Sequence, residues 1–415
     1  MGLESGYVKI LKFFKIFGLV PNQLNEPNLV ISRRYASLII IFLTFYWAVL
    51  LLSFWVPHGK DVNKISVISN WIQLLFNAVT LSVALGYPIV ASPIVSRIRN
   101  LFANFDQKVA ANGVEGDSRK ISRKIGFIVG PLVTFNSYML VYDLYVTCFH
   151  TAVSHFWYWL LTFLPLFVYS FGVGAALCVL THLRARFKIL NKQLLREIRT
   201  DKCGVVIEVL KTGEIRKDGK KLRDTFHLMH DLYELAKLIG DYYGPMFLAV
   251  FTAIFVVTTI QTYYIYTFFL SFEVMGSDVI WSIILSANII LLNFSLVFSI
   301  TWICEAISNE SKVAIDRIAN LKINGTVSVN EAEDVQRIAN CFSCTTSSIT
   351  FSANGFFNIN YSMLCSMIGG ITTYLIIYIQ FYSLYGQEDE LPSGHRSNGM
   401  DQELRDSLLN ESESD

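Results

Sequence analysis

The sequence predicts an all-α membrane protein with seven transmembrane helices, a cytosolic N-terminus, an extracellular C-terminus and a cytosolic helical anchor region. Its 415 residues are 53% hydrophobic and only 16% charged, and the mean hydropathy is +0.44. Soluble domains carry about a quarter charged residues, so this shortfall indicates a membrane protein. Lysine and arginine are also spread very unevenly over the polar segments, which predicts the orientation of the chain.

Seven segments are apolar and long enough to cross the bilayer. A helix needs roughly 20 apolar residues to span about 30 Å of hydrocarbon. The predicted spans are residues 35–56, 66–91, 125–148, 156–181, 244–270, 278–304 and 359–382.

The positive charges lie almost entirely on one side of these spans. Of the 34 lysines and arginines, 30 fall in the segments that share a compartment with the N-terminus, and 4 fall on the other side. Positive residues mark the cytosolic side, so the N-terminus is predicted inside. A seven-helix receptor coupled to G proteins runs the opposite way, which argues against that alternative. A transporter, the other alternative, usually shows internal repeats and interrupted spans, and we find neither.

Several polar segments also carry helical patterns. Lys9, Lys12 and Lys15 alternate with apolar residues near the N-terminus, which is typical of a helix in the membrane interface, although a solvated basic arm stays open. The run LRARFKILNKQLLREI continues the fourth span, and LRDTFHLMHDLYELAKLIGD leads into the fifth with apolar steps of three and four. Ser328 and Glu331 fit a capping box before the last span. Residues 201–221 fit either a hairpin or an irregular insert.

These features divide the chain into seven parts. The parts are a cytosolic amphipathic segment (1–34), spans one to four (35–182), a cytosolic helical loop (183–243), spans five and six (244–304), a cytosolic loop and helix (305–357), the last span (358–383) and an acidic, disordered extracellular tail (384–415).

The last predicted span carries a stripe of small and polar residues. Ser366, Gly370, Thr373, Ile377 and Gln380 recur at steps of four and three, so they share one face of a helix. Polar groups inside a membrane usually face a bundle interior or a water-filled path. A pore is one interpretation, and it needs several copies of the chain around an axis. The others are a small-residue packing face between helices, or contact of Gln380 with lipid headgroups.

Three sequence features resemble the insect gustatory receptors. The string Thr373-Tyr374, five apolar residues, Gln380-Phe381 is similar to the TYhhhhhQF motif of that family, where h is apolar. The run ITFSANGFFNINYSML resembles the family's entry to its last helix, and FGLVP resembles its opening. Here the chain departs from the family by continuing 34 residues beyond Phe381.

This resemblance implies a ligand-gated cation channel of four subunits, akin to the insect odorant receptors. It implies that the last helix lines the pore, that Gln380 and Phe381 form the outer constriction, and that Thr373 and Ile377 lie on the same wall. It also implies a plasma membrane protein of chemosensory neurons. Leu375 stands where one branch of sugar receptors has Glu, so a fructose-type sugar and a bitter or deterrent compound stay open as ligands.

The outer halves of the spans supply candidate ligand residues. Aromatic walls with a few polar groups suit a small organic molecule, and an ionisable group inside a span is a candidate functional residue. The alternative is an ordinary aromatic belt at the interface. The candidates are Tyr138, Tyr142, Asp143, Trp159, Gln261, Tyr264 and Asn288.

The sequence gives no indication of disulfide bonds, a zinc site or enzymatic activity. Seven scattered cysteines form no disulfide framework, and the single C-F-S-C at residues 341–344 lacks partner ligands for zinc. No nucleophile motif, phosphate loop or metal-ligand pair is present, so neither an enzyme nor a cofactor is expected. The expected partners are a small-molecule tastant, membrane lipid, permeant cations and further receptor subunits, as a homotetramer or a heterotetramer, and no nucleic acid.

Overall fold

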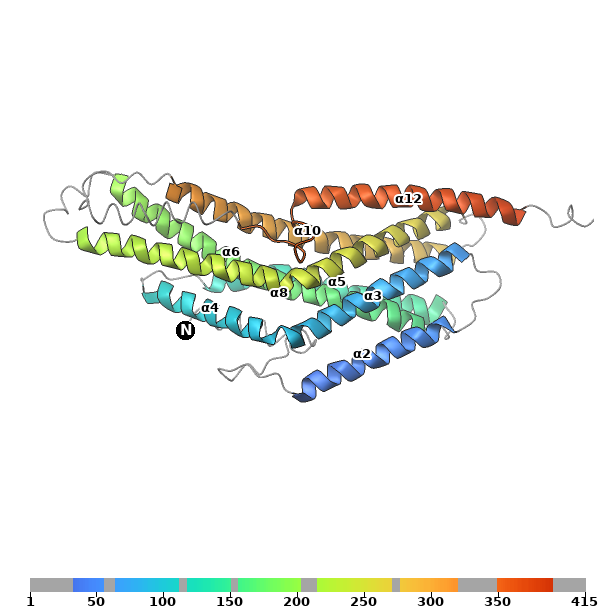
Figure 1. The fold of residues 1–415 in the computed structure, drawn as a ribbon. Coiled ribbons are helices and arrows are strands. Elements are labelled where there is room, and N and C mark those ends of the chain that lie inside the picture. Colours follow the sequence, from blue (N-terminus) through green and yellow to red (C-terminus); the bar gives the residue numbers. More distant parts are fainter. Residues whose placement is uncertain are drawn as a thin grey trace, which may run out of the picture.

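The structure is a computed structural model, and it describes residues 33–55, 64–111, 118–150, 156–202, 215–270, 277–319 and 349–390. Within these residues the backbone is almost entirely helical, and the molecule is elongated along its helices (Figure 1). The helices are α2 (Arg33–Phe54), α3 (Lys64–Val90), α4 (Ser92–Ala111), α5 (Ser118–His150), α6 (Phe156–Lys202), α8 (Ile215–Leu270), α10 (Ser277–Ala319) and α12 (Tyr361–Glu390).

The prediction of an all-α protein with seven spans is confirmed. Among the described helices, all but α4 are long and apolar enough to cross a membrane. They differ greatly in how much of the apolar window is covered, from 89% buried in α6 to 6% in α12. The fourth span is therefore the centre of the bundle, whereas the last span lies on its surface.

Helices α6, α8 and α10 continue beyond the spans that the sequence predicts and pack with α4 into a second half of the molecule (Figure 1). Ion pairs connect the helices of this half, and they are concentrated on α4, α6, α8 and α10. The pairs are Asp106–Arg186, Lys108–Asp231, Arg97–Glu234 and Lys188–Glu310.

Helix α4 is an element for which the sequence analysis made no prediction. It is too polar to register as a span, but it has one apolar face that packs against α8. The buried residues on this face recur at steps of three and four, as an amphipathic helix requires. They are Val95, Ile98, Phe102, Phe105 and Val109.

A tight loop precedes α12 and docks on α8. Backbone hydrogen bonding closes it, with the Ile359 N–H donating to the Phe351 carbonyl at 2.8 Å. Asn354 and Gly355 have φ of 52° and 82°, the left-handed region that glycine and asparagine tolerate best. A Cβ atom at Gly244 of α8 would lie 3.0 Å from the Asn354 nitrogen, so glycine is what permits this approach.

Four expectations differ from the structure or lie outside it. Helix α8 begins at Ile215, so part of the segment 201–221 is helical rather than a hairpin or an irregular insert. Helix α12 continues to Glu390, beyond the predicted end of the last span, because no proline occurs before residue 392. The amphipathic N-terminal segment and the helix expected after Ser328 lie outside the described residues.

Candidate functional site

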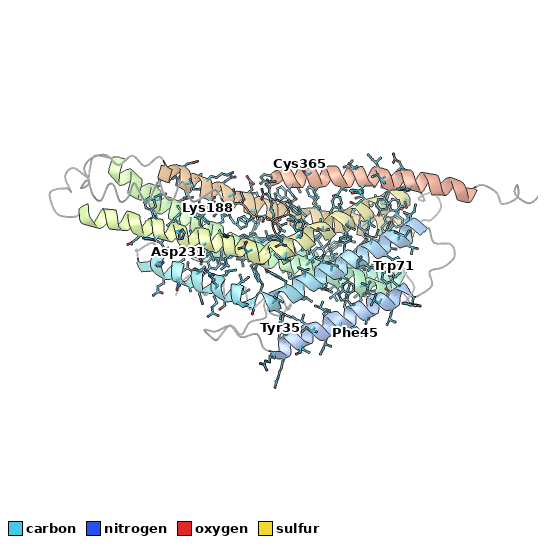
Figure 2. The ribbon with its side chains drawn as sticks, in the orientation of Figure 1. Tyr35, Phe45, Trp71, Lys188, Asp231 and Cys365 are labelled. Atoms are coloured by element: carbon cyan, nitrogen blue, oxygen red, sulfur yellow. The ribbon has the colours of Figure 1, made fainter. Side chains whose placement is uncertain are left out.

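Helix α12 is exposed over most of its membrane-spanning length, and one of its exposed faces is mainly small and polar. We define this open face as Ser362, Ser366, Gly369, Thr373 and Gln380, which are exposed and recur at steps of three, four or seven residues. The opposite side of α12 packs on the protein, with Leu364 buried. Cys365, labelled in Figure 2, is also exposed on the uncovered side. A single chain therefore presents a small and polar stripe outward.

The structure changes one member of the predicted stripe. Gly370 faces α8 rather than the open face, because a Cβ atom there would lie 2.9 Å from Cε2 of Phe255. Its neighbour Gly369 has no atom within 4 Å of such a Cβ position and takes the place on the open face. Adjacent residues are about 100° apart around a helix, so Gly369 and Gly370 point in different directions.

The four predicted pore residues are all exposed. Thr373 and Gln380 lie on the open face, and the Gln380 amide forms no hydrogen bond within the described part of the chain. Ile377 lies beside that face at 38% exposure, and Phe381 lies further round the helix at 51% exposure. An unsatisfied amide facing hydrocarbon is costly, so the position of Gln380 calls for water or a second protein surface.

Two tyrosines hold α12 on α8. The Tyr374 ring contacts Phe255 edge-on at 5.7 Å, and the Tyr378 ring lies 5.2 Å from that of Tyr263. Tyr374 thus packs against α8 with part of its ring. These contacts fix which side of α12 faces the protein and which side stays open.

Three of the predicted ligand residues come together between α5 and α10. The rings of Tyr138 and Tyr142 lie 5.8 Å apart, and Tyr142 also contacts Trp281 at 6.1 Å. Asn288 of α10 donates a 3.4 Å hydrogen bond to the Tyr138 hydroxyl. Asp143, next to Tyr142 in sequence, is buried at 9% exposure.

Two further candidates lie in a separate group between α3 and α8. The Gln261 amide donates to the Gln73 carbonyl oxygen at 3.2 Å, and the Tyr264 hydroxyl donates to Asn70 at 2.6 Å. No hydrogen bond or ring contact among the described residues joins this group to Tyr142. Trp159 lies in the first turn of α6, and its side chain is outside the described part.

Sequence reasoning missed a buried polar layer in the membrane half. The Tyr169 hydroxyl of α6 donates to Asn293 of α10 at 2.7 Å, and the Ser170 hydroxyl donates to Asn136 of α5 at the same distance. All four side chains are almost completely buried. A lone amide within an apolar span, such as Asn293, is the signal that would have found this layer.

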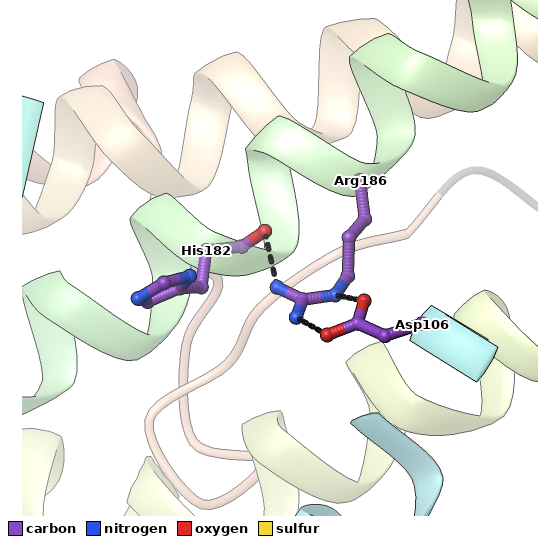
Figure 3. Close-up of polar contacts among 3 residues, drawn as sticks. All are labelled: Asp106, His182 and Arg186. Atoms are coloured by element: carbon purple, nitrogen blue, oxygen red, sulfur yellow. Dashed lines mark hydrogen bonds and ion pairs between the residues drawn. The ribbon is translucent and has the colours of Figure 1, made fainter. Parts of the chain in front are cut away.

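It also missed a buried ion pair in the other half. Arg186 of α6 donates to both carboxylate oxygens of Asp106 in α4, at 2.9 and 2.7 Å (Figure 3). The same guanidinium donates to the His182 carbonyl at 3.1 Å and lies over the ring of Phe102. A bidentate pair of this kind fixes the angle between two helices as well as their separation.

Seven helices long and apolar enough to span a membrane define a multi-pass membrane protein. The chain belongs to the 7tm chemosensory receptor family, whose model matches residues 10–385. This family is one of receptors rather than enzymes. None of the curated proteins matches the chain by sequence.

Two solved structures share the fold. One is the insect olfactory receptor OR5 from Machilis hrabei in complex with eugenol, with a TM-score of 0.63, 12% identity, and coverage of 91% of this chain and 98% of that chain. A second structure of the olfactory receptor OR5 from Machilis hrabei has a TM-score of 0.55 and 12% identity, and the match covers 90% of this chain and 97% of that chain. At this identity the similarity shows the fold alone.

Proposed function

We propose that this protein is a gustatory receptor subunit that acts as a tastant-gated, non-selective cation channel. Four subunits, identical or drawn from related receptors, surround a central pore in the plasma membrane of chemosensory neurons. The tastant is a fructose-type sugar or a bitter or deterrent compound. The single observation that carries the proposal is the exposed Gln380 amide on the open face of the least covered span.

The physical reason is the need to satisfy that amide. One helix cannot enclose water, whereas four open faces around an axis form a wall of hydroxyl and amide groups. In this arrangement Thr373 and Gln380 contact water and permeant cations, while Ile377 and Phe381 supply apolar side chains. An apolar constriction closes a pore by excluding water when it narrows.

The ligand site is proposed in the outer part of the bundle. Tyr138, Tyr142, Asp143 and Asn288 supply aromatic surface and polar groups from α5 and α10. Gln261 and Tyr264 do so from α8, and Trp159 supplies a further ring from α6. A sugar or an alkaloid-like deterrent needs aromatic faces and a small number of hydrogen-bonding groups, which these residues offer.

Cysteine accessibility tests the pore directly. In a Cys365→Ser background, Thr373→Cys and Gln380→Cys are each exposed to a charged, membrane-impermeant thiol reagent during recordings from expressing cells. We expect the reagent to reduce the current by more than half at both positions. The matched control is Ile368→Cys, which is exposed on another side of α12 and should show no reduction.

The outcomes separate the alternatives. Equal block at positions 368, 373 and 380 would indicate a general effect on the helix rather than a pore. No modification at 373 and 380, in variants that reach the surface and conduct, would place the open face against lipid and contradict the proposal. Gln380→Ala and Phe381→Ala should in addition change the basal current or the ion selectivity at unchanged surface expression.

A further inference from the structure

A cavity of about 290 Å³ lies where α10 passes the loop that leads into α12. On one side it is lined by Glu305, Ser308 and Lys312 of α10, and on the other by Asn360 and Ser362 at the start of α12. Phe351 and Ile359 are buried and line its apolar part. Polar and apolar groups thus converge on one partly open cavity outside the candidate ligand residues.

Three polar side chains of this cavity, all on α10, have no partner in the part of the chain that the structure describes, whereas Asn360 accepts a hydrogen bond from the Met363 N–H at 2.9 Å. Glu305 and Lys312 form no ion pair with any part of the chain that the structure describes. The Ser308 residue is only 8% exposed, yet its hydroxyl forms no hydrogen bond within the described residues. The Ser308 hydroxyl lines the cavity and is therefore free to bond to a ligand there.

The cavity lies at the depth where lipid headgroups are expected. Figure 1 shows that α2 begins, α3 gives way to α4 and α12 begins at a similar level along the long axis of the molecule. This level separates the half with the seven spans from the half that extends out of the membrane. Pockets between helices at such a boundary are suited to lipid headgroups.

The opposite charges of Glu305 and Lys312, and the distance between them, favour a zwitterionic ligand. A plain anion would be repelled by Glu305, and a plain cation by Lys312. Seven residues apart on one helix, these two Cα atoms are separated by about 10 Å. That separation matches the length of a phosphate joined to an ammonium group by a two-carbon linker, with one hydrogen bond added at each end. The N-terminus of α12, where Asn360 accepts a hydrogen bond from the Met363 N–H, adds the positive end of a helix dipole on the phosphate side.

We propose that this cavity binds the phosphoethanolamine headgroup of a membrane phospholipid, with the phosphate at Lys312 and Ser308 and the ammonium group at Glu305. A choline headgroup has no N–H donor for Glu305, so phosphatidylcholine is the matched negative ligand. Because the lipid contacts both α10 and the loop before α12, it would stabilise the position where the last span begins.

Retention of lipid by the purified full-length protein tests this site. The protein in detergent is equilibrated with equal amounts of phosphatidylethanolamine and phosphatidylcholine of identical acyl chains, and the bound lipids are measured by native mass spectrometry. We expect the ethanolamine lipid to be retained about tenfold over the choline lipid, as loss of a charge-assisted hydrogen bond implies. This readout needs no current, so it is independent of the proposed channel function.

Matched variants distinguish the cavity from general lipid binding. Lys312→Gln and Glu305→Gln should each bring the retention ratio close to one, whereas Lys312→Arg should keep most of it. Ser308→Leu fills the cavity without changing its charge and should also abolish the preference, with folding checked by thermal unfolding. Lys237→Gln is the control, because Lys237 is exposed on α8 and does not line the cavity.

Competition with free phosphoethanolamine distinguishes a soluble phosphoethanolamine compound from a membrane phospholipid as the natural occupant. If it displaces the lipid at millimolar concentration, the natural occupant is a soluble phosphoethanolamine compound. If only the lysolipid displaces it, the occupant is a membrane phospholipid. Equal retention of the ethanolamine and choline lipids by the parent protein, or an unchanged preference in both charge variants, would overturn the proposal.

Discussion

Gly370 of α12 lies directly against the ring of Phe255 in α8, so closely that a methyl group at position 370 would be 2.9 Å from the ring Cε2. Together with the neighbouring contact between Phe255 and Tyr374, this approach determines how α12 sits on the bundle. The last span is held by few contacts, so a substitution at Gly370 should shift the position of the whole helix.

Gly370→Ala should therefore destabilise the protein. The added methyl group forces the Phe255 ring or α12 to move, and overpacking of this kind typically costs about 1–3 kcal/mol. Thermal unfolding of the purified protein in detergent measures the effect. Gly369→Ala is the matched control, because no atom lies within 4 Å of its Cβ position. A similar loss of stability in both variants would show that the Phe255 contact is not responsible, since the change from glycine to alanine by itself favours the helix.

Breaking the Asp106–Arg186 pair should be among the most destabilising changes in the second half of the molecule. The Arg186 side chain is 2% exposed, so removing the carboxylate in Asp106→Asn leaves a nearly buried charge, at a cost of about 3–5 kcal/mol. Thermal unfolding again provides the measurement.

The exposed pair Arg97–Glu234 is the comparison for that prediction. It lies between α4 and α8, where water screens both side chains. Arg97→Gln should therefore lower the unfolding temperature much less than Asp106→Asn. If the two variants lose equal stability, burial of the Asp106–Arg186 pair is not what makes it important.

Gly244→Ala should disrupt the docking of the loop before α12. Its methyl group would lie 3.0 Å from the Asn354 backbone nitrogen, and backbone cannot rotate away as a side chain can. At Gly240, one turn earlier, the nearest atom is a ring carbon of Phe351 at 3.5 Å, which is ordinary contact. We expect Gly244→Ala to lower the unfolding temperature and the surface expression, and Gly240→Ala to change both only slightly. The reverse order would contradict this picture of the loop.

Asp143→Asn should weaken the response to the activating compound. Asp143 is buried and follows Tyr142 of the aromatic group in sequence, and we expect a ligand at that group to reach its carboxylate. With a panel of sugars and deterrents applied to expressing cells, the half-maximal concentration of the active compound should rise about tenfold. Tyr264→Phe tests the second group in the same assay, because it removes the hydroxyl that donates to Asn70 and leaves the ring. Unchanged half-maximal concentrations in both variants, at normal surface expression, would exclude these two groups as the ligand site.

Much of the fold follows from local properties of the sequence. Hydropathy identified all seven spans because a transmembrane helix must be apolar over its own length, whatever its neighbours are. The uninterrupted continuation of α6 beyond the fourth span was likewise visible in its sequence. Helix α4 was missed because its polar composition gives no span, and its apolar face acquires meaning only when α8 lies beside it.

The candidate site depended more on tertiary structure. The sequence predicted that Thr373 and Gln380 share a face, and both are exposed. It could not predict that Gly370 packs inward while Gly369 faces outward, because both glycines lie near the edge of the same stripe. It also treated Tyr142 and Tyr264 as parts of one set, although different helices surround them.

The sequence by itself determined the number and length of the spans and the family motif. Each of these depends only on residues that are consecutive or periodically spaced along the chain. Only the tertiary structure decided which helices are neighbours, that α6 is enclosed while α12 is open, and that Arg186 meets Asp106 from another helix. The physical reason is that hydrophobicity specifies that a helix enters the membrane, but in lipid it does not specify which other helix it packs against. That choice is made by close contacts such as Gly370 on Phe255 and by hydrogen bonds between spans.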